Sequence, residues 1–213
     1  MINYRYSKNK LKYFFRHYSL FLLLIVGTLI VGIIAGSVAV KVLSYQQKEA
    51  LINYLANFSG ELGELLTNQQ LLFKKVMISN LKFVLLLWVL GLSLIGIVFV
   101  PLIIFFRGFI LGFTVGFLVD ELFFRGLLLA IIAIFPQNLF IIPALILASL
   151  FCLVFVFKIL TSIVGRSNLN FWAIIAKYSA LMSVVVLILI VAAVIEIYFT
   201  PQLINVFNKF LGF

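Results

Sequence analysis

The sequence has few charged residues, one histidine and one cysteine. Only 10% of its 213 residues are charged, and six of them are acidic. A water-soluble domain carries about 25% charged residues, so the composition excludes that class of protein. The lone cysteine, Cys152, excludes disulfide frameworks, cysteine-based zinc sites and paired-thiol redox chemistry.

Hydrophobic residues make up 65% of the chain, 24 residues are phenylalanine, and the mean hydropathy is +1.29. Helices that face lipid are apolar on every side, and this composition is typical of them. We therefore predict an all-α fold, a polytopic transmembrane helical bundle. The net charge of +10 is expected at the ends of its spans, where it faces anionic membrane lipids, and nucleic acid is not expected as a partner.

A helix needs roughly 20 residues to cross a bilayer, and four apolar runs have this length or nearly this length. They are Leu20–Val40, Phe83–Val100 with a continuation to Phe106, Leu139–Phe157 and Tyr178–Phe199.

The stretch between Pro101 and Pro136 contains charged residues that decide its topology. One continuous helix would place Asp120 and Glu121 near the bilayer centre, at a cost of about 2.5–3.5 kcal/mol for each charge. We expect instead a turn near Pro101, a third span at Ile103–Val119, and residues 120–125 at the far interface. A short half-helix, Gly126–Phe135, would follow, interfacial or re-entrant, and break at Pro136. This gives five spans and one half-helix.

Basic residues set the predicted orientation. Five precede the first span, Lys158, Arg166 and Lys177 separate the last two, and Arg107 is expected at the turn after the second. The positive-inside rule then puts the N-terminus in the cytoplasm and the C-terminus outside. The predicted organisation is a basic tail at 1–18, a first span at 19–43, an extracytoplasmic segment at 44–82, four spans at 83–199 with a broken stretch at 120–143, and an extracytoplasmic tail at 200–213.

The segment 44–82 has the composition of a soluble helix. Leu55, Phe58 and Leu62 belong to an apolar stripe at helical spacing, with polar residues between them, which predicts an amphipathic helix. Its apolar face would lie on the outer leaflet or cap the bundle, or it would dock an extracytoplasmic partner.

No catalytic motif is present in the sequence, and we expect no catalytic residue, metal site or cofactor. The one histidine, His17, stands at the entry to the first span, where an interfacial anchor is expected. Glu121 and Arg125 are spaced i and i+4, which suits an interfacial ion pair on one helical face.

Two rows of glycine have the spacing at which membrane helices approach closely. Gly32 and Gly36 form one row in the first span, and Gly108, Gly112 and Gly116 form another in the third. Such rows pack helices within one bundle or form a seam between two copies in a homo-oligomer.

The most distinctive segment is a polar break in an apolar stretch, formed by Pro136, Gln137, Asn138 and Pro143. Pro136 lacks a backbone donor, so carbonyls freed near it need partners, which the two side-chain amides can supply. The segment is either a self-capped turn or a polar patch where a partner or lipid headgroup docks.

These features together resemble the stage II sporulation protein M family of integral membrane proteins. The resemblance rests on the basic tail and first span, on residues 107–112 (Arg-Gly-Phe-Ile-Leu-Gly), and on the break at 136–138 followed by Ile-Pro-Ala at 142–144. Many relatives outside sporulation have Pro-His-Gly at the break and a Glu three residues later. Gln137, Asn138 and Ile141 stand there instead, so the chain looks like the sporulation branch. Arg107 stands where the family commonly has Asn.

The resemblance implies a non-enzymatic role in engulfment, at the mother-cell engulfing membrane or septum. Family members are thought to recruit and anchor a peptidoglycan-degrading complex, whose chemistry is done by stage II sporulation proteins P and D. The alternative from the residues is a transporter or channel, because broken helices often line permeation sites.

Overall fold

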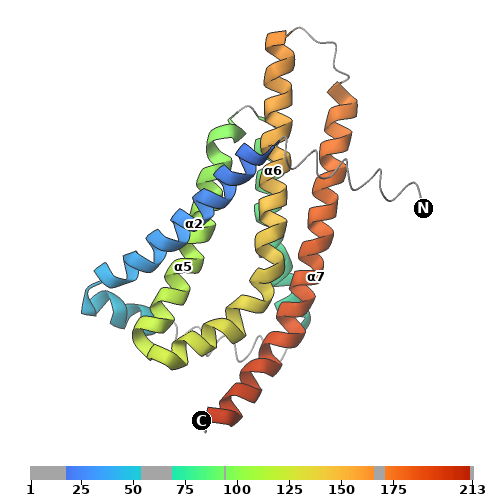
Figure 1. The fold of residues 1–213 in the computed structure, drawn as a ribbon. Coiled ribbons are helices and arrows are strands. Elements are labelled where there is room, and N and C mark those ends of the chain that lie inside the picture. Colours follow the sequence, from blue (N-terminus) through green and yellow to red (C-terminus); the bar gives the residue numbers. More distant parts are fainter. Residues whose placement is uncertain (1–17, 54–68, 94, 166–170, 212–213) are drawn as a thin grey trace, which may run out of the picture.

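The structure, a computed structural model, describes residues 18–53, 69–93, 95–165 and 171–211. In these ranges the chain forms a bundle of helices (Figure 1). The elements are α2 (Ser19–Val42), a helical stretch at 45–53, α4 (Gln69–Leu92), α5 (Gly96–Leu129), the π-helix η1 (Ala130–Ile134), α6 (Phe135–Gly165) and α7 (Phe171–Leu211).

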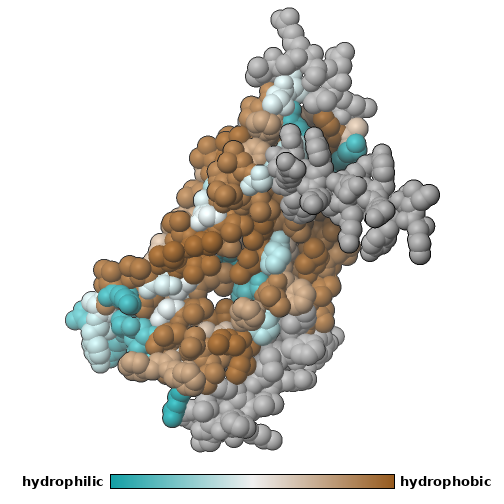
Figure 2. All heavy atoms as spheres, in the orientation of Figure 1, coloured by the Kyte–Doolittle hydropathy of each residue, from teal (hydrophilic) through white to brown (hydrophobic). Residues whose placement is uncertain are grey.

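Four of the described helices are long and apolar enough to cross a bilayer: Ser19–Val42, Gly96–Ile132, Phe135–Ser162 and Phe171–Val194. A fifth apolar stretch, Met77–Leu92, is shorter. Apolar residues cover most of the visible surface (Figure 2), as expected of helices that face hydrocarbon rather than water. The prediction of an all-α polytopic membrane bundle is confirmed.

Helix α6 is the centre of the bundle. In its most apolar stretch 61% of the residues are buried, against 22% in each of α2, α5 and α7. Leu150, Leu153 and Val156 on α6 are almost completely buried. The other helices therefore surround α6 and turn much of their own surface to the lipid.

The chain turns between the end of α4 at Leu92 and the start of α5 at Gly96, and the turn predicted near Pro101 is wrong. Backbone bonds of 3.1 Å from Ser93 to Leu90 and from Gly96 to Ser93 close this turn. A Cβ at Gly96 would overlap the carbonyl oxygen of Leu90, so only glycine fits there. Pro101 lies inside α5, and the predicted spans Phe83–Val100 and Ile103–Val119 are replaced by α4 and α5.

The predicted half-helix at Gly126–Phe135 is not a separate element. Helix α5 bends at Phe123, which has a positive φ of 50°, and the chain continues through η1 directly into α6. Pro136 and Pro143 both lie within α6, so the break predicted at Pro136 is wrong. The stretch that leads into α6 runs obliquely beneath the upright part of that helix (Figure 1).

The two ends of the bundle can be told apart from contacts between helix ends. The ring of Phe21, near the start of α2, lies 5.5 Å from that of Phe157, near the end of α6. Lys158 therefore lies at the end where the described chain begins. The opposite end carries residues 43–53 and the bend at 120–125, and we call it the kinked end (Figure 1).

Candidate functional site

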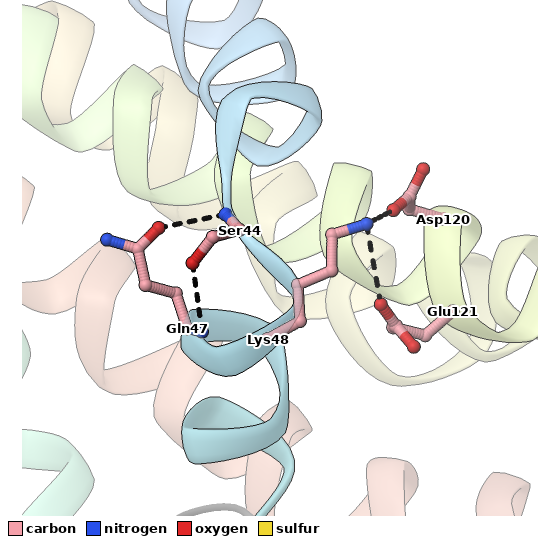
Figure 3. A network of polar contacts seen from close by, with 5 residues as sticks. All are labelled: Ser44, Gln47, Lys48, Asp120 and Glu121. Carbon is pink, nitrogen blue, oxygen red and sulfur yellow. Dashed lines mark hydrogen bonds and ion pairs between the residues drawn. The ribbon is translucent and has the colours of Figure 1, made fainter.

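An ion-pair cluster at the kinked end joins two segments that are far apart in the sequence. The Nζ of Lys48 donates a hydrogen bond to Oδ2 of Asp120 and lies 3.6 Å from Oε1 of Glu121. Figure 3 shows the lysine reaching across from the helical stretch 45–53 to both carboxylates on α5. The hydrogen bond to Asp120 raises the pKa of Lys48 above its usual value.

The helical stretch 45–53 begins with a reciprocal cap. The backbone N–H of Ser44 donates to Oε1 of Gln47 at 2.9 Å, and the backbone N–H of Gln47 donates to Oγ of Ser44 at 3.4 Å (Figure 3). This is a capping box, which fixes where a helix begins and the direction in which it leaves. Ser44 and Lys48 together therefore set the direction in which the chain leaves α2.

The predicted pairing of Glu121 with Arg125 assumed an unbroken helical turn. The positive φ at Phe123 interrupts that turn, so the i and i+4 spacing no longer places both residues on one helical face. The structure gives Glu121 an ion pair with Lys48. Spacing could not reveal Lys48 as a partner, because it lies 72 residues before Asp120.

The two glycine rows lie against each other within one chain. A Cβ at Gly32 or Gly36 would overlap backbone carbonyls of α5, and a Cβ at Gly108 or Gly112 would overlap backbone carbonyls of α2. Gly116 is less tight, because its Cβ would lie 3.1 Å from the Cα of Ser37. The rows therefore form an intramolecular seam between α2 and α5.

Ser37 adds a polar contact to this seam. Its hydroxyl donates to the carbonyl of Ile33 at 2.9 Å in its own helix and to that of Gly112 at 3.2 Å across the seam. Close backbone approach and such small polar contacts hold helices together in lipid, where no hydrophobic force acts between them. The seam makes α2 and α5 a tight pair whose kinked end carries the cluster of Lys48.

The predicted polar break is a site where α6 is bent rather than broken. The side-chain Nδ2 of Asn138 donates to the carbonyl oxygen of Ile134 at 2.8 Å, so this amide supplies a donor near Pro136. Asn138 is only 7% exposed. Its Oδ1 is buried and has no hydrogen-bond partner among the described residues.

Arg107 lies inside α5, and its predicted place at a turn is wrong. It comes 11 residues after the start of α5 at Gly96, about 16 Å along the helix axis. Its guanidinium carbon lies 5.2 Å from the centre of the Phe83 ring on α4. That is the geometry of a cation–π contact, which stabilises a cation away from water.

Other predicted residues lie beyond what the structure describes. The expected docking residues Leu55, Phe58 and Leu62 fall within 54–68, outside the described residues. Within the described residues, no group of three His, Cys, Asp or Glu could hold a metal ion.

Comparison with known proteins gives one match. A family model described as Stage II sporulation protein M matches residues 22–201. No curated protein and no solved structure matches the chain. The family match covers α2 to most of α7, and so includes the cluster of Lys48, the glycine seam and the bent start of α6. The chain therefore belongs to the stage II sporulation protein M family of sporulation-related membrane proteins.

Proposed function

We propose that this protein is a non-enzymatic membrane scaffold that recruits and anchors a peptidoglycan-degrading complex during engulfment in endospore formation. Stage II sporulation proteins P and D are the proposed partners, and the mother-cell engulfing membrane or septum is the proposed location. The family is not known as an enzyme family. A scaffold needs a rigid body in the membrane and one surface held out for partners.

The observation that carries the proposal is the ion-pair cluster at the kinked end. Lys48 fixes the beginning of the segment that follows α2 to Asp120 and Glu121 on α5. The seam of glycines joins α2 and α5 along the turns that precede the cluster. The segment 44–82 would thus leave the bundle in a fixed direction, which lowers the entropic cost of binding a partner.

The proposed orientation puts the kinked end outside the cell. Lys158 and Lys177 are exposed; Lys158 lies at the opposite end, beside the start of α2, and Lys177 lies near the start of α7. By the positive-inside rule that opposite end would be cytoplasmic. Segment 44–82 would then face the space that contains peptidoglycan.

A charge exchange tests the role of the cluster. In Lys48→Glu the cluster has three carboxylates and no cation, so the segment after α2 should separate from α5 and less stage II sporulation protein P should co-purify. In the double variant Lys48→Glu with Asp120→Lys, one attractive pair is restored, and co-purification should recover. The measurement is the amount of stage II sporulation protein P captured with the tagged full chain from detergent-solubilised spore-forming cells.

Lys177→Glu is the matched control, because it reverses an exposed charge near the start of α7 and should leave co-purification unchanged.

A triple replacement of Leu55, Phe58 and Leu62 by Ser addresses the proposed docking stripe itself and should abolish co-purification while membrane insertion persists. Full co-purification by both the Lys48→Glu and the triple-serine variants would exclude this segment as the docking site.

Transport is the competing function. A path for a solute would need polar groups along its length, but among the described residues the buried polar side chains are Asn138 and Ser149. We therefore rank transport second. Flux into vesicles reconstituted with the purified chain, lost in an Asn138 variant, would reverse that order.

A further inference from the structure

A cavity of about 240 Å³ lies between the seam of α2 and α5 and the oblique start of α6. Figure 2 shows the apolar surface hollowed in this region. Twelve residues line the cavity, and ten of them are hydrophobic or glycine. The two polar ones are Ser37 on α2 and Asn138 on α6.

Asn138, which lines this cavity, has an unused acceptor. Its amide orientation is fixed, because the carbonyl of Ile134 only accepts and must therefore face the NH₂ group. That leaves Oδ1 buried and without a partner among the described residues. A buried acceptor without a donor costs free energy, so a ligand that brings one donor gains affinity here.

A second cavity, of about 270 Å³ between α4 and α7, offers no such group. Its indole donor, Nε1 of Trp88, already bonds the hydroxyl of Ser179 at 3.1 Å. The hydroxyl of Ser183 bonds the carbonyl of Ser179 at 3.0 Å. The unused acceptor therefore distinguishes the first cavity.

The distance of the cavity from the charged kinked end indicates which part of a membrane lipid lies beside it. Ser37 lies four residues before Lys41, and Gly112 lies eight residues before Asp120, which is about 6 Å and 12 Å along the two helices. If the charged kinked end marks the headgroup level, the cavity lies at the level of the glycerol and the first methylenes.

We propose that this cavity binds one membrane lipid that carries a free hydroxyl at its glycerol, with diacylglycerol as the simplest example. Its hydroxyl donates to Oδ1 of Asn138, and the first part of an acyl chain fills the apolar remainder. Ile131 and Phe135 border the cavity and are 50% and 59% exposed. Because these side chains face open space, the proposal has them move aside so that the hydroxyl reaches the enclosed Oδ1.

Two other occupants fit less well. A water molecule needs two to four polar partners. The hydroxyl of Ser37 already donates to the carbonyls of Ile33 and Gly112, so among the lining side chains only Oδ1 of Asn138 is buried without a partner. An acyl chain without a hydroxyl fills the apolar part but leaves Oδ1 without a donor. A hydroxyl-bearing lipid satisfies both the apolar lining and the acceptor.

The test compares two lipids that differ only in the donor. Dioctanoylglycerol has the free hydroxyl, and its acetylated derivative has an ester in its place. Each is titrated into the purified full chain in detergent, and the apparent affinity is obtained from the rise of the thermal midpoint with ligand concentration. We expect dioctanoylglycerol to bind roughly fivefold or more tightly than the acetylated lipid, as one added hydrogen bond implies.

Three variants locate the effect. Asn138→Leu should bind both lipids equally, and Ala130→Phe, which projects a ring into the cavity from a lining position, should weaken both. Ser149→Ala is the control, because the buried hydroxyl of Ser149 also has no partner in the part of the chain that the structure describes but does not line the cavity. The preference should therefore persist.

Equal affinity of the wild-type chain for the two lipids would overturn the proposal. A preference that survives in Ala130→Phe would do so as well, because the donor would then act elsewhere. If Asn138→Leu does not fold, these two results still decide the question.

Discussion

Gly112 on α5 lies directly against the backbone of Ile33 on α2, so that even one methyl group at Gly112 would overlap the carbonyl oxygen of Ile33. The neighbouring contact has the same character, since a Cβ at Gly108 would overlap the carbonyl of Leu29. Backbone cannot move aside as the end of a side chain can. This seam therefore depends on glycine at each position of close approach.

Gly112→Ala should destabilise the protein. The added methyl must push α2 and α5 apart, and overpacking of this kind costs roughly 1–3 kcal/mol. Thermal unfolding of the purified chain in detergent measures the effect as a lower midpoint.

Gly27→Ala is the matched control on α2. A Cβ at Gly27 meets nothing within 4 Å, and alanine favours a helix over glycine by about 1 kcal/mol. Its midpoint should be unchanged or higher. An equal loss for both variants would show that the seam is not the cause.

The pairing of the two glycine rows is an example of what sequence can predict. The spacing of four residues identifies a helix face that allows close approach, and it singled out Gly32, Gly36, Gly108 and Gly112. Spacing alone could not say whether the partner row belonged to the same chain or to a second copy. That choice depends on how the loops bring α2 and α5 together.

The path of the chain from α4 to α6 could not be predicted in the same way. Pro101 was expected to end a helix, but the turn forms where Gly96 permits a close backbone crossing. Arg107 was assigned to a turn by its charge, whereas it lies inside α5 and contacts Phe83 on α4. Propensity and charge are local signals, and packing against neighbouring helices overrides both.

Lys48 should react slowly with amine-directed acylating reagents. Its raised pKa leaves less of the neutral, nucleophilic amine at about pH 9 than an ordinary lysine has. Lys41 is exposed one helical turn before the cap and provides the comparison within the same molecule. Mass spectrometry after timed acylation gives both rates.

Replacing Asp120 by Asn and Glu121 by Gln removes the charges that raise the pKa of Lys48, so its acylation should become faster while that of Lys41 stays constant. Because the pKa of Lys48 is raised in the folded protein, its contact with the carboxylates stabilises the fold fully at pH values below the usual lysine pKa of 10.5. That stabilisation is lost as the pH rises through the higher pKa of Lys48 in the folded protein. A rate that does not change in the double variant would contradict the ion-pair cluster.

Tyr178→Phe should loosen α7 from α4. The hydroxyl of Tyr178 donates to the carbonyls of Leu87 at 2.9 Å and Trp88 at 3.3 Å, and the side chain is only 2% exposed. Loss of this hydrogen bond should lower the free energy of unfolding by about 1 kcal/mol. Tyr45 is 81% exposed, so Tyr45→Phe should have no effect on the thermal midpoint, and a similar loss in both variants would point to a nonspecific cause.

The two ends of the bundle should be labelled from opposite sides of the membrane. In a Cys152→Ala background, a membrane-impermeant maleimide should react in intact cells with cysteines placed at Asp120 and Arg125, because both residues belong to the kinked end. Cysteines at Lys158 and Lys177 should react only after the cells are permeabilised, since Lys158 lies at the other end beside the start of α2 and Lys177 lies near the start of α7, which follows the end of α6. Labelling of Asp120 and Lys158 from the same side would contradict the structure, and the reverse pattern would place segment 44–82 in the cytoplasm and remove the proposed contact with a peptidoglycan-degrading partner.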